Sequence, residues 1–359
     1  MPLPLARLQE RLNHEYWPWQ LIYLPALPFA LWHVVRTGHG AFFTNVNPAM
    51  DLGGFFGESK SAILRSLPEA WYPTTLVVEP GTPWSTVQER MSEAGLALPL
   101  VLKPDVGERG DGVALIDTEE ELRRALSTTE HVQLLQRKVE WEHEYGLFVV
   151  KDPRSARTRL LSITGKAMLR VTGDGRHSVE ELLRRTWRGS KQVERLRGYK
   201  QALLASVPAA GERVLVEPIG NHCRGTTFLD GNHLMAPALE RAVSSIMTAL
   251  DGVYYGRLDV KARSDEDLQQ GRFVVMEING VTSEPGHIYD PSYSIFRCWR
   301  ELLRHLAYLP KLSDALREQG HRPASVRSLW RRYRLYFRSQ ERSFPGRSAT
   351  RSTRSLNEE

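Results

Sequence analysis

Lys103 and the glycines that follow it are the first residues whose types and spacing suggest chemistry. An apolar run at 98–102 ends at Lys103, glycines recur through 107–112, and a second apolar run covers 113–116. This order predicts two short strands joined by a flexible loop. Glycines let backbone N–H groups approach an anion closely, and the lysine adds positive charge, so a phosphate group suits the pattern. The lysine precedes the glycines and a strand follows them, which excludes a Walker loop. The alternative interpretation is a glycine-rich hairpin without a ligand.

A second set of polar residues lies more than 140 residues further on, in two predicted strands at 254–261 and 273–278. Within each strand the polar positions are two apart, so each set shares one face. These positions are Arg257, Asp259 and Lys261 on the first strand, and Glu277 and Asn279 on the second. If the strands pair, oxygen ligands of the kind that Mg²⁺ prefers come together. The alternative is a polar, solvent-facing side of a sheet.

The elements that would position these residues are short strands and helices in mixed order. Strands are predicted at 75–78, 132–135, 147–150, 160–171 and 214–217, and helices at 61–67, 85–94, 118–126, 178–183 and 235–250. Thr118 followed by Glu121 forms a capping box at the start of one helix. Because strands and helices do not alternate strictly, the pattern favours an α+β fold over a doubly wound one.

Composition restricts the class of protein further. The chain of 359 residues is long enough for two or three compact units, and its charged and apolar fractions are those of a folded soluble protein. Its two cysteines, Cys223 and Cys298, exclude a disulfide framework and suit a reducing compartment. The net charge of +6 comes from an Arg-rich C-terminal tail, with ten arginines after residue 321, so no nucleic-acid-binding core is expected.

Residues 16–35 form an apolar segment without any Asp, Glu, Lys or Arg. Twenty such residues are long enough to cross a bilayer, but prolines at 18, 25 and 28 argue against one straight helix. Three interpretations stay open: a membrane-embedded or interfacial anchor, a segment packed on the protein, and an oligomer contact. The Arg-rich tail favours a membrane surface, since anionic lipids attract arginines close to an apolar anchor.

Taken together, these motifs resemble the ATP-grasp superfamily over residues 53–291. The segment 171–183, VTGDGRHSVEELL, is similar to a segment of cyanophycin synthetases, and the strands with Arg257, Asp259, Glu277 and Asn279 are similar to those of D-alanine–D-alanine ligases. The resemblance implies an ATP-grasp fold, in which two α+β subdomains close over ATP, with a shortened N-terminal region.

The resemblance also implies a role for each matching residue. Mg²⁺, with Mn²⁺ as a substitute, would be bound by Asp259, Glu277 and Asn279. Arg257 would face the reacting carboxylate, and Arg109 would contact the γ-phosphate. The remaining contacts to ATP would come from Lys60, Lys103, Gly107, Gly110 and Gly112 around the phosphates, Gln136, Lys138 and Val139 at the adenine, and Glu144 at the ribose. Gln136 departs from the family, whose hinge often begins with Glu.

The activity implied is an ATP- and Mg²⁺-dependent carboxylate–amine ligase that works through an acyl phosphate, with small-molecule carboxylate and amine substrates and no nucleic acid. The alternatives are an ATP-grasp enzyme with a non-amine acceptor and a non-catalytic, membrane-associated nucleotide-binding protein. A cytoplasmic location, either free or at the cytoplasmic face of the membrane, is expected. The expected organisation is an apolar N-terminal segment (1–40), a shortened α/β region (41–98), two ATP-grasp subdomains (99–140 and 141–305) and the Arg-rich tail (306–359).

Overall fold

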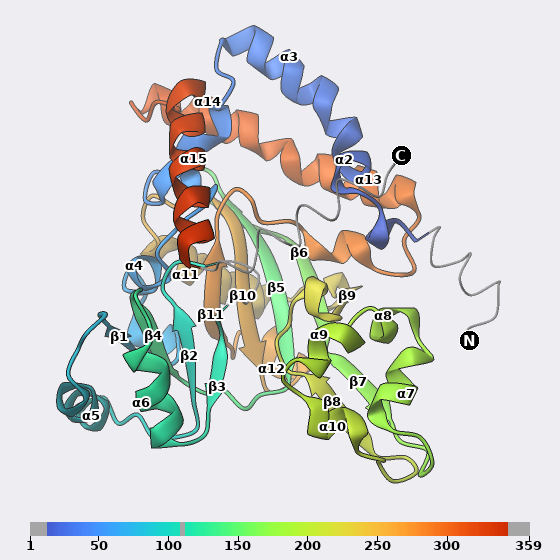
Figure 1. Cartoon of the computed structure of the whole chain (residues 1–359). Coiled ribbons are helices and arrows are strands. Elements are labelled where there is room, and N and C mark those ends of the chain that lie inside the picture. The colour runs from blue at the N-terminus through green and yellow to red at the C-terminus, as the bar shows by residue number, and fades with distance from the viewer. Residues whose placement is uncertain (1–12, 108–111, 344–359) are drawn as a thin grey trace.

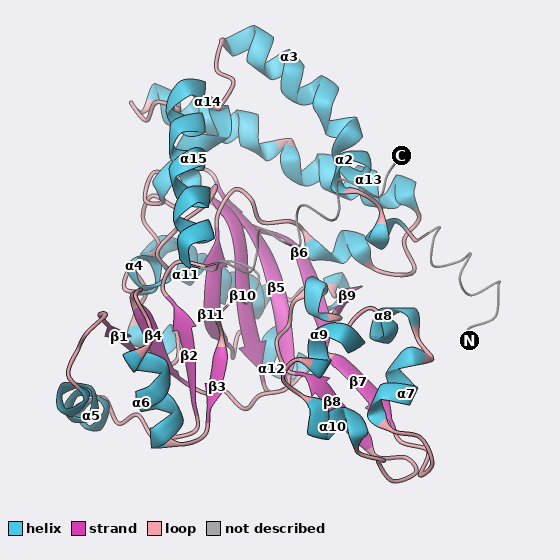
Figure 2. Ribbon diagram, in the orientation of Figure 1, coloured by secondary structure: helices cyan, strands magenta, loops and turns pink. Residues whose placement is uncertain are grey.

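A computed structural model describes residues 13–107 and 112–343 (Figure 1). Within this part of the chain, eleven strands form three antiparallel sheets, and helices surround them (Figure 2). The predicted α+β fold is confirmed. The strands are β1 (Thr75–Val78), β2 (Leu100–Pro104), β3 (Ala114–Ile116), β4 (Gln133–Arg137), β5 (His143–Lys151), β6 (Thr158–Ala167), β7 (Leu169–Thr172), β8 (Arg213–Glu217), β9 (Thr227–Asp230), β10 (Tyr255–Ala262) and β11 (Val274–Asn279).

The α-helices lie mostly between these strands and after the last one. They are α2 (Trp19–Tyr23), α3 (Leu27–Thr37), α4 (Lys60–Leu64), α5 (Trp84–Glu93), α6 (Glu119–Ser127), α7 (Val179–Arg184), α8 (Trp187–Ser190), α9 (Val193–Arg197), α10 (Gln201–Ala205), α11 (Pro237–Ala249), α12 (Asp265–Gln269), α13 (Ile295–Leu306), α14 (Tyr308–Glu318) and α15 (Val326–Ser343). The 3₁₀ turns used below are η1 (His14–Tyr16), η2 (Leu24–Ala26), η3 (Phe42–Asn45) and η8 (Gly286–Tyr289).

The five-stranded sheet, in the order β11-β10-β5-β6-β9, forms the centre of the molecule (Figure 1). One of its faces packs on α11 through Leu239, Val243 and Ile246, which contact apolar residues of β5, β6 and β10. The other face has two halves. Phe148 and Tyr255 form its apolar half, which packs against η3 and α14.

The polar half of the same face is what positions the candidate site. Residues two apart on a strand point to the same side, so Glu144 and Gly146 share the face of Phe148, while Arg257 and Asp259 share the face of Tyr255. The strand register places Lys166 of β6 opposite Glu144. The side chains of Glu144, Lys166, Arg257 and Asp259 therefore lie on the part of this face that η3 and α14 do not cover.

The four-stranded sheet, in the order β1-β4-β2-β3, carries the lysine and glycine motif. β2 and β3 pair antiparallel, with Leu100 opposite Ile116, so the predicted strand pair is confirmed. α5 and α6 supply apolar side chains to its core, where Leu100 and Leu122 are fully buried. The predicted capping box of Thr118 and Glu121 is present at the start of α6.

The strand region predicted at 160–171 is confirmed, and it consists of two strands because the chain changes sheets at Met168. β6 belongs to the five-stranded sheet, whereas β7 pairs with β8 in a separate two-stranded sheet. Each of the two strands buries apolar side chains, so the break between them is not visible in the sequence pattern.

The apolar segment 16–35 forms short helical pieces rather than one long helix. Pro25 and Pro28 stand in the first turns of η2 and α3, where a missing N–H costs nothing. Ile22 packs with Ile288, Cys298 and Leu302, so one side of the segment rests on η8 and α13. Among the described residues, no helix is long and apolar enough to cross a membrane.

Candidate functional site

Arg257 and Asp259 form the centre of the polar half of the sheet. Arg257 Nε and Nη2 donate to the two carboxylate oxygens of Asp259 over 2.7 and 3.0 Å, and Nη1 donates to the carbonyl of Glu284 over 3.1 Å. Both side chains are largely buried. Burial opposes the charged form of Asp259, but Arg257 and Lys166 outweigh it and lower the pKa of this carboxyl group. The arginine is therefore held in one orientation, with Nη1 turned toward the loop at Glu284.

Lys166 links this pair to Glu144. Its ammonium group lies 2.7 Å from Glu144 Oε1 and 3.4 Å from Asp259 Oδ2, and its side chain is almost fully buried. Burial lowers the pKa of Lys166, but the two carboxylates raise it further, so the net shift is upward. Sequence reasoning did not assign Lys166 a role. Lys166 is the one charged residue in 160–167 (LLSITGKA), and that was the signal that could have found it.

Glu277 lies on β11 directly opposite Asp259 of β10, as the spacing of the polar residues predicted. Its Oε1 is 3.6 Å from the ammonium group of Lys60, and about a third of its side chain is exposed. Asn279 donates from Nδ2 to Asp259 Oδ2 over 3.3 Å. The structure thus brings the three predicted metal ligands onto one patch.

Lys103 is buried on β2, four residues before Gly107. Its ammonium group donates to Gln136 Oε1 over 3.0 Å and to the carbonyl of Met276 over 3.3 Å, which connects the four-stranded sheet to β11. Burial lowers the pKa of Lys103 to about 8, with Glu277 acting in the opposite direction. An anion that binds beside Lys103 would favour the charged form of the ammonium group and would raise its pKa again.

Lys60 contacts Gly107, the first glycine of the predicted loop. Its ammonium group donates to the carbonyl of Gly107 over 2.5 Å. Asp105 holds the start of α4 next to this loop, since its carboxylate accepts hydrogen bonds from Ser59 Oγ and from the Ser61 backbone N–H. Sequence reasoning missed Asp105. Gly112 has a φ of +72°, which favours glycine there, whereas Arg109 and Gly110 lie outside the described residues.

The predicted hinge, 136–139, begins in the last two residues of β4. Gln136 is buried, and its Nε2 donates to Thr75 Oγ1 over 2.7 Å while its oxygen accepts from Lys103. The carbonyl of Val139 accepts from Lys261 over 3.3 Å, and Lys138 lies 3.8 Å from Glu140. The side chain of Gln136 thus connects the hinge to Lys103.

Glu284 borders the site on the side of Arg257, and sequence reasoning did not assign it a role. Its two oxygens accept hydrogen bonds from the hydroxyls of Tyr23 and Tyr289, over 2.6 and 3.2 Å. Burial and this carboxylate both raise the pKa of Tyr23 well above its usual value. The N-terminal segment therefore contacts the site through α2.

The oxygen donors of this patch fit Mg²⁺, although they do not all stand open. Glu277 and Asn279 offer a partly exposed carboxylate and an amide on adjacent positions of one strand face. Asp259 already accepts from Arg257, Lys166 and Asn279, so one of these contacts has to loosen before it can bind a metal. No group of three or more His, Cys, Asp or Glu that could hold a metal occurs in the described part of the chain.

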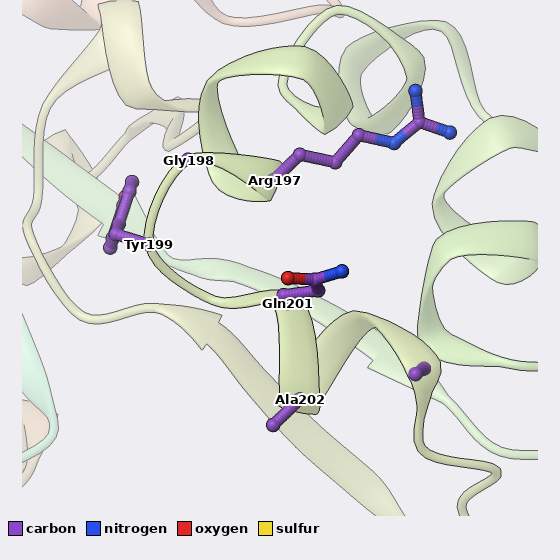
Figure 3. A pocket seen from close by; sticks show the side chains of 6 residues that line it. Arg197, Gly198, Tyr199, Gln201 and Ala202 are labelled. Carbon is purple, nitrogen blue, oxygen red and sulfur yellow. The ribbon is translucent and has the colours of Figure 1, made fainter.

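A surface depression of about 600 Å³ lies elsewhere, around α9 and α10 (Figure 3). None of the predicted site residues lines this depression. Its lining residues are Arg197, Gly198, Tyr199, Gln201, Ala202 and Ala205.

No protein-family model and no curated protein sequence matches the chain. A solved bifunctional glutathione synthetase from Pasteurella multocida is 20% identical over 69% of this chain and 35% of its own, with a TM-score of 0.39. A D-alanine–D-alanine ligase from Bacillus anthracis is 13% identical over 70% and 68% of the two chains, with a TM-score of 0.38. VanG D-Ala:D-Ser ligase from Enterococcus faecalis is 12% identical over 68% and 60%, with a TM-score of 0.40.

The chain spans only about a third of the length of the glutathione synthetase. At these identities and TM-scores the matches say nothing about individual site residues, whose chemistry rests on the geometry described above.

Proposed function

We propose that the chain is an ATP- and Mg²⁺-dependent ligase that joins a carboxylate to an amine through an acyl phosphate. The observation that carries the proposal is the convergence of three distant segments on one patch. Lys60 contacts both the carbonyl of Gly107 and the carboxylate of Glu277, while Lys103 contacts the carbonyl of Met276, next to Glu277. Two lysines beside Gly107 and the carboxylate of Glu277 suit a nucleoside triphosphate with its metal.

The proposed reaction has two steps. An oxygen of the substrate carboxylate attacks the γ-phosphorus of ATP, the bond to the β-phosphate oxygen breaks, and ADP leaves. The nitrogen of the amine then attacks the carbonyl carbon of the acyl phosphate, inorganic phosphate leaves, and the nitrogen loses a proton. A carboxylate is already nucleophilic, so the protein has to position the reactants and neutralise charge rather than supply a nucleophile.

Lys103 and Lys60 would neutralise the phosphates. Gly107, Gly112 and the loop between them, with Gly110 and Arg109, would cover the phosphates. Backbone groups of Gln136, Lys138 and Val139 would read the adenine, and Glu144, held by Lys166, would face the ribose. Glu277, Asn279 and Asp259 would hold Mg²⁺, which when bound supplies positive charge to the phosphate oxygens.

Arg257 would orient the substrate carboxylate. A guanidinium group has five N–H donors. Asp259 and Glu284 take three of them among the described contacts, which leaves two for an oxyanion. Because Asp259 already fixes the Arg257 side chain, the arginine loses little conformational freedom when the substrate binds.

Glu284 supports an amine as the second substrate. Burial opposes the charged form of Arg257, but the carboxylates of Asp259, Glu277 and Glu284 outweigh it and raise the pKa of the guanidinium, whose Nη1 donates to the Glu284 carbonyl. A carboxylate beside the position of the reacting carbonyl would attract an ammonium group and could accept its proton. A hydroxyl or thiol acceptor would gain less from this negative charge.

Nucleotide binding is the first test. Full-length protein is titrated with ATP, with and without Mg²⁺, and metal-dependent binding is expected. The protein is then incubated with ATP and pools of amino acids, and ADP together with a condensed product is sought by mass spectrometry. Binding without any product would favour the non-catalytic alternative, and ADP formation with an ester or thioester product would favour the non-amine acceptor.

Glu277→Gln sharpens the test. It removes the charge of the open carboxylate while keeping its shape, so turnover should be abolished and the thermal unfolding curve should change little. Glu318→Gln is the matched control, because Glu318 also contacts a basic side chain, Arg154, but on the exposed surface. Unchanged turnover in Glu277→Gln would remove the metal assignment.

A further inference from the structure

The carboxylate of Glu284 is held by two tyrosine hydroxyls, one from the N-terminal segment and one from η8. Tyr23 of α2 donates to Oε1 over 2.6 Å, and Tyr289 of η8 donates to Oε2 over 3.2 Å. A carboxylate offers about four lone-pair sites, so the hydroxyls occupy only part of its capacity as an acceptor. The two tyrosines therefore fix the direction of the carboxylate and still leave lone pairs for a further donor.

The main chain at Glu284 is fixed as well. Its carbonyl accepts from Arg257 Nη1 over 3.1 Å, and the hydroxyl of the preceding Ser283 donates to the carbonyl of Gly280 over 2.6 Å. This loop directly follows β11, the strand that carries two of the predicted metal ligands. Glu284 is thus attached to the arginine that is proposed to orient the substrate carboxylate.

Tyr23 belongs to a packed part of the N-terminal segment. Its neighbour Ile22 is buried and packs with Ile288 of η8 and with α13, beside which α2 lies in Figure 1. Further upstream, the buried carboxylate of Glu15 lies 2.6 Å from Arg188. The hydroxyl of Tyr23 is therefore brought to Glu284 by an element that is held at more than one point.

Glu284 has no basic partner of its own. In the part of the chain that the structure describes, no Lys, Arg or His side chain forms an ion pair with this half-buried carboxylate, and its side-chain contacts are the two tyrosine hydroxyls. Arg257 directs its paired donors to Asp259 instead. Because burial of a carboxylate is costly unless a cation pairs with it, Glu284 indicates a cationic ligand.

We propose that Tyr23 is a positioning residue of the acceptor site, where it holds the Glu284 carboxylate in the direction that binds the ammonium group of the incoming amine. The inference rests on the proposed ligase function and extends it, because it makes the N-terminal segment a part of the acceptor site. The acceptor is then an amine that binds as a cation. Its ammonium group has N–H donors for the open lone pairs of Glu284, and Glu284 accepts the proton that this group loses before its nitrogen attacks.

The hydroxyl of Tyr23 suits this role. Burial and the carboxylate of Glu284 both raise its pKa, so the phenol stays protonated and donates at neutral pH. A hydrogen bond to a charged group is stronger than one between neutral groups. Without the Tyr23 hydroxyl, the carboxylate would lose one of the two contacts that set its direction. Binding of the amine should then weaken, whereas the residues assigned to ATP keep all their contacts.

Two nucleophiles separate the acceptor site from the rest of the reaction. Full-length protein is incubated with ATP, Mg²⁺ and a pool of the common amino acids, which offers both carboxylates and ammonium groups, with and without hydroxylamine. Hydroxylamine is uncharged near neutral pH and needs no carboxylate to bind it. Its nitrogen attacks the carbonyl carbon of the acyl phosphate and loses a proton, inorganic phosphate leaves, and a hydroxamate forms. Mass spectrometry measures the amides and the hydroxamates.

Tyr23→Phe should lower the ratio of amide to hydroxamate about tenfold, because it removes one hydrogen bond to the carboxylate. The amine concentration for half-maximal amide formation should rise, while that of ATP should not. Tyr289→Phe should lower the ratio in the same direction, and Glu284→Gln should lower it further, since it removes the charge. Tyr293→Phe is the matched control, because its hydroxyl also donates to a carboxylate, Asp230, over 2.7 Å; its ratio should equal that of wild type.

The product ratios decide between the outcomes. If wild type makes both products and the ratio is unchanged in Tyr23→Phe, this inference is overturned and the ligase function stands. Equal loss of amide and hydroxamate in Tyr23→Phe would also overturn it, since the tyrosine would then only support the fold of the loop. If wild type makes neither product, the proposed ligase function fails and the inference fails with it. Thermal unfolding checks the fold of each variant, and Tyr289→Phe and Glu284→Gln decide the matter if Tyr23→Phe is unstable.

Discussion

Gly146 of β5 lies against the side chain of Arg257 on β10: a Cβ atom at residue 146 would be 2.9 Å from Cδ of Arg257. The absence of a side chain at 146 therefore leaves the space through which the arginine reaches Asp259. This relationship makes the orientation of Arg257 testable without changing the arginine itself.

Gly146→Ala should displace Arg257 and lower kcat by about 10- to 100-fold, because small misplacements of a positioning group are costly. ATP binding should change less than about threefold, since the nucleotide contacts proposed here come from other residues. Steady-state kinetics and nucleotide titration of the variant measure both effects.

Gly165→Ala on the neighbouring strand β6 is the control. A Cβ atom there would meet its nearest neighbour at 3.8 Å, which is ordinary contact. Its kinetics should match those of wild type. Equal loss of activity in both variants would mean that the sheet, rather than Arg257, had been disturbed.

Arg257→Lys should lose most of the turnover although it keeps the positive charge. Lysine offers a single ammonium group and cannot donate in parallel to both oxygens of Asp259 while it also contacts the Glu284 carbonyl. The product assay should show a drop in kcat of about 100-fold or more. If the lysine variant retains full turnover, Arg257 contributes charge only, and the proposed orientation of the substrate carboxylate is wrong.

The sequence predicted the parts of the site that follow from strand periodicity. Arg257, Asp259 and Glu277 were expected on paired strand faces because polar residues two apart stand out in apolar strands, and the register places Asp259 opposite Glu277. Lys103 was found because it precedes a glycine turn. These are local patterns, and local patterns can be read from a sequence.

The contacts that could not be predicted connect segments far apart in the chain. Asp105 binds Ser59 and Ser61, and Tyr23 donates to Glu284 across 261 residues. The sequence around these residues contains no pattern that predicts the contacts, because they depend on how separate elements pack. The segment α2–η2–α3 is a similar case: the sequence shows that it is apolar, but only packing decides that Ile22 and Ala26 are buried while Leu31 and Val35 are exposed.

The ammonium group of Lys103 should give ATP binding a pH dependence. Burial lowers its pKa to about 8, so most Lys103 is charged at pH 7 and most is neutral at pH 9. Binding of a phosphate above pH 8 must then take up a proton, and ATP affinity should fall about tenfold from pH 7 to pH 9. Calorimetry in buffers of different ionisation enthalpy should record proton uptake near pH 8 to 9.

Lys103→Met should remove that dependence as well as most of the affinity. Its free energy of unfolding at pH 7 should stay within about 1 kcal/mol of wild type, because relief of the buried charge offsets the lost hydrogen bonds. Between pH 8 and 10 the unfolded wild type holds a proton that the folded state lacks, so wild-type stability should rise relative to the variant. Parallel stability curves for the two proteins would show that Lys103 is not perturbed.

Glu15→Gln should destabilise the attachment of the N-terminal segment. The buried carboxylate of Glu15 lies 2.6 Å from Arg188 and 2.7 Å from His222. Breaking such a buried pair costs about 3 kcal/mol.

Burial lowers the pKa of His222, but hydrogen bonds to Cys223 and Glu15 outweigh it and raise the value to about 9 from 6.5. The lowered pKa of Glu15 means that its carboxylate contributes stability above about pH 4.5 and loses it in acid. The part of this stability that comes from His222 should be complete below pH 6.5 and be lost as the pH rises through about 9. Urea unfolding of wild type and variant should show their difference shrinking over that range. Glu318→Gln, which breaks the exposed pair with Arg154, should cost less than about 1 kcal/mol; an equally small cost at Glu15 would mean that the segment is not held by this carboxylate.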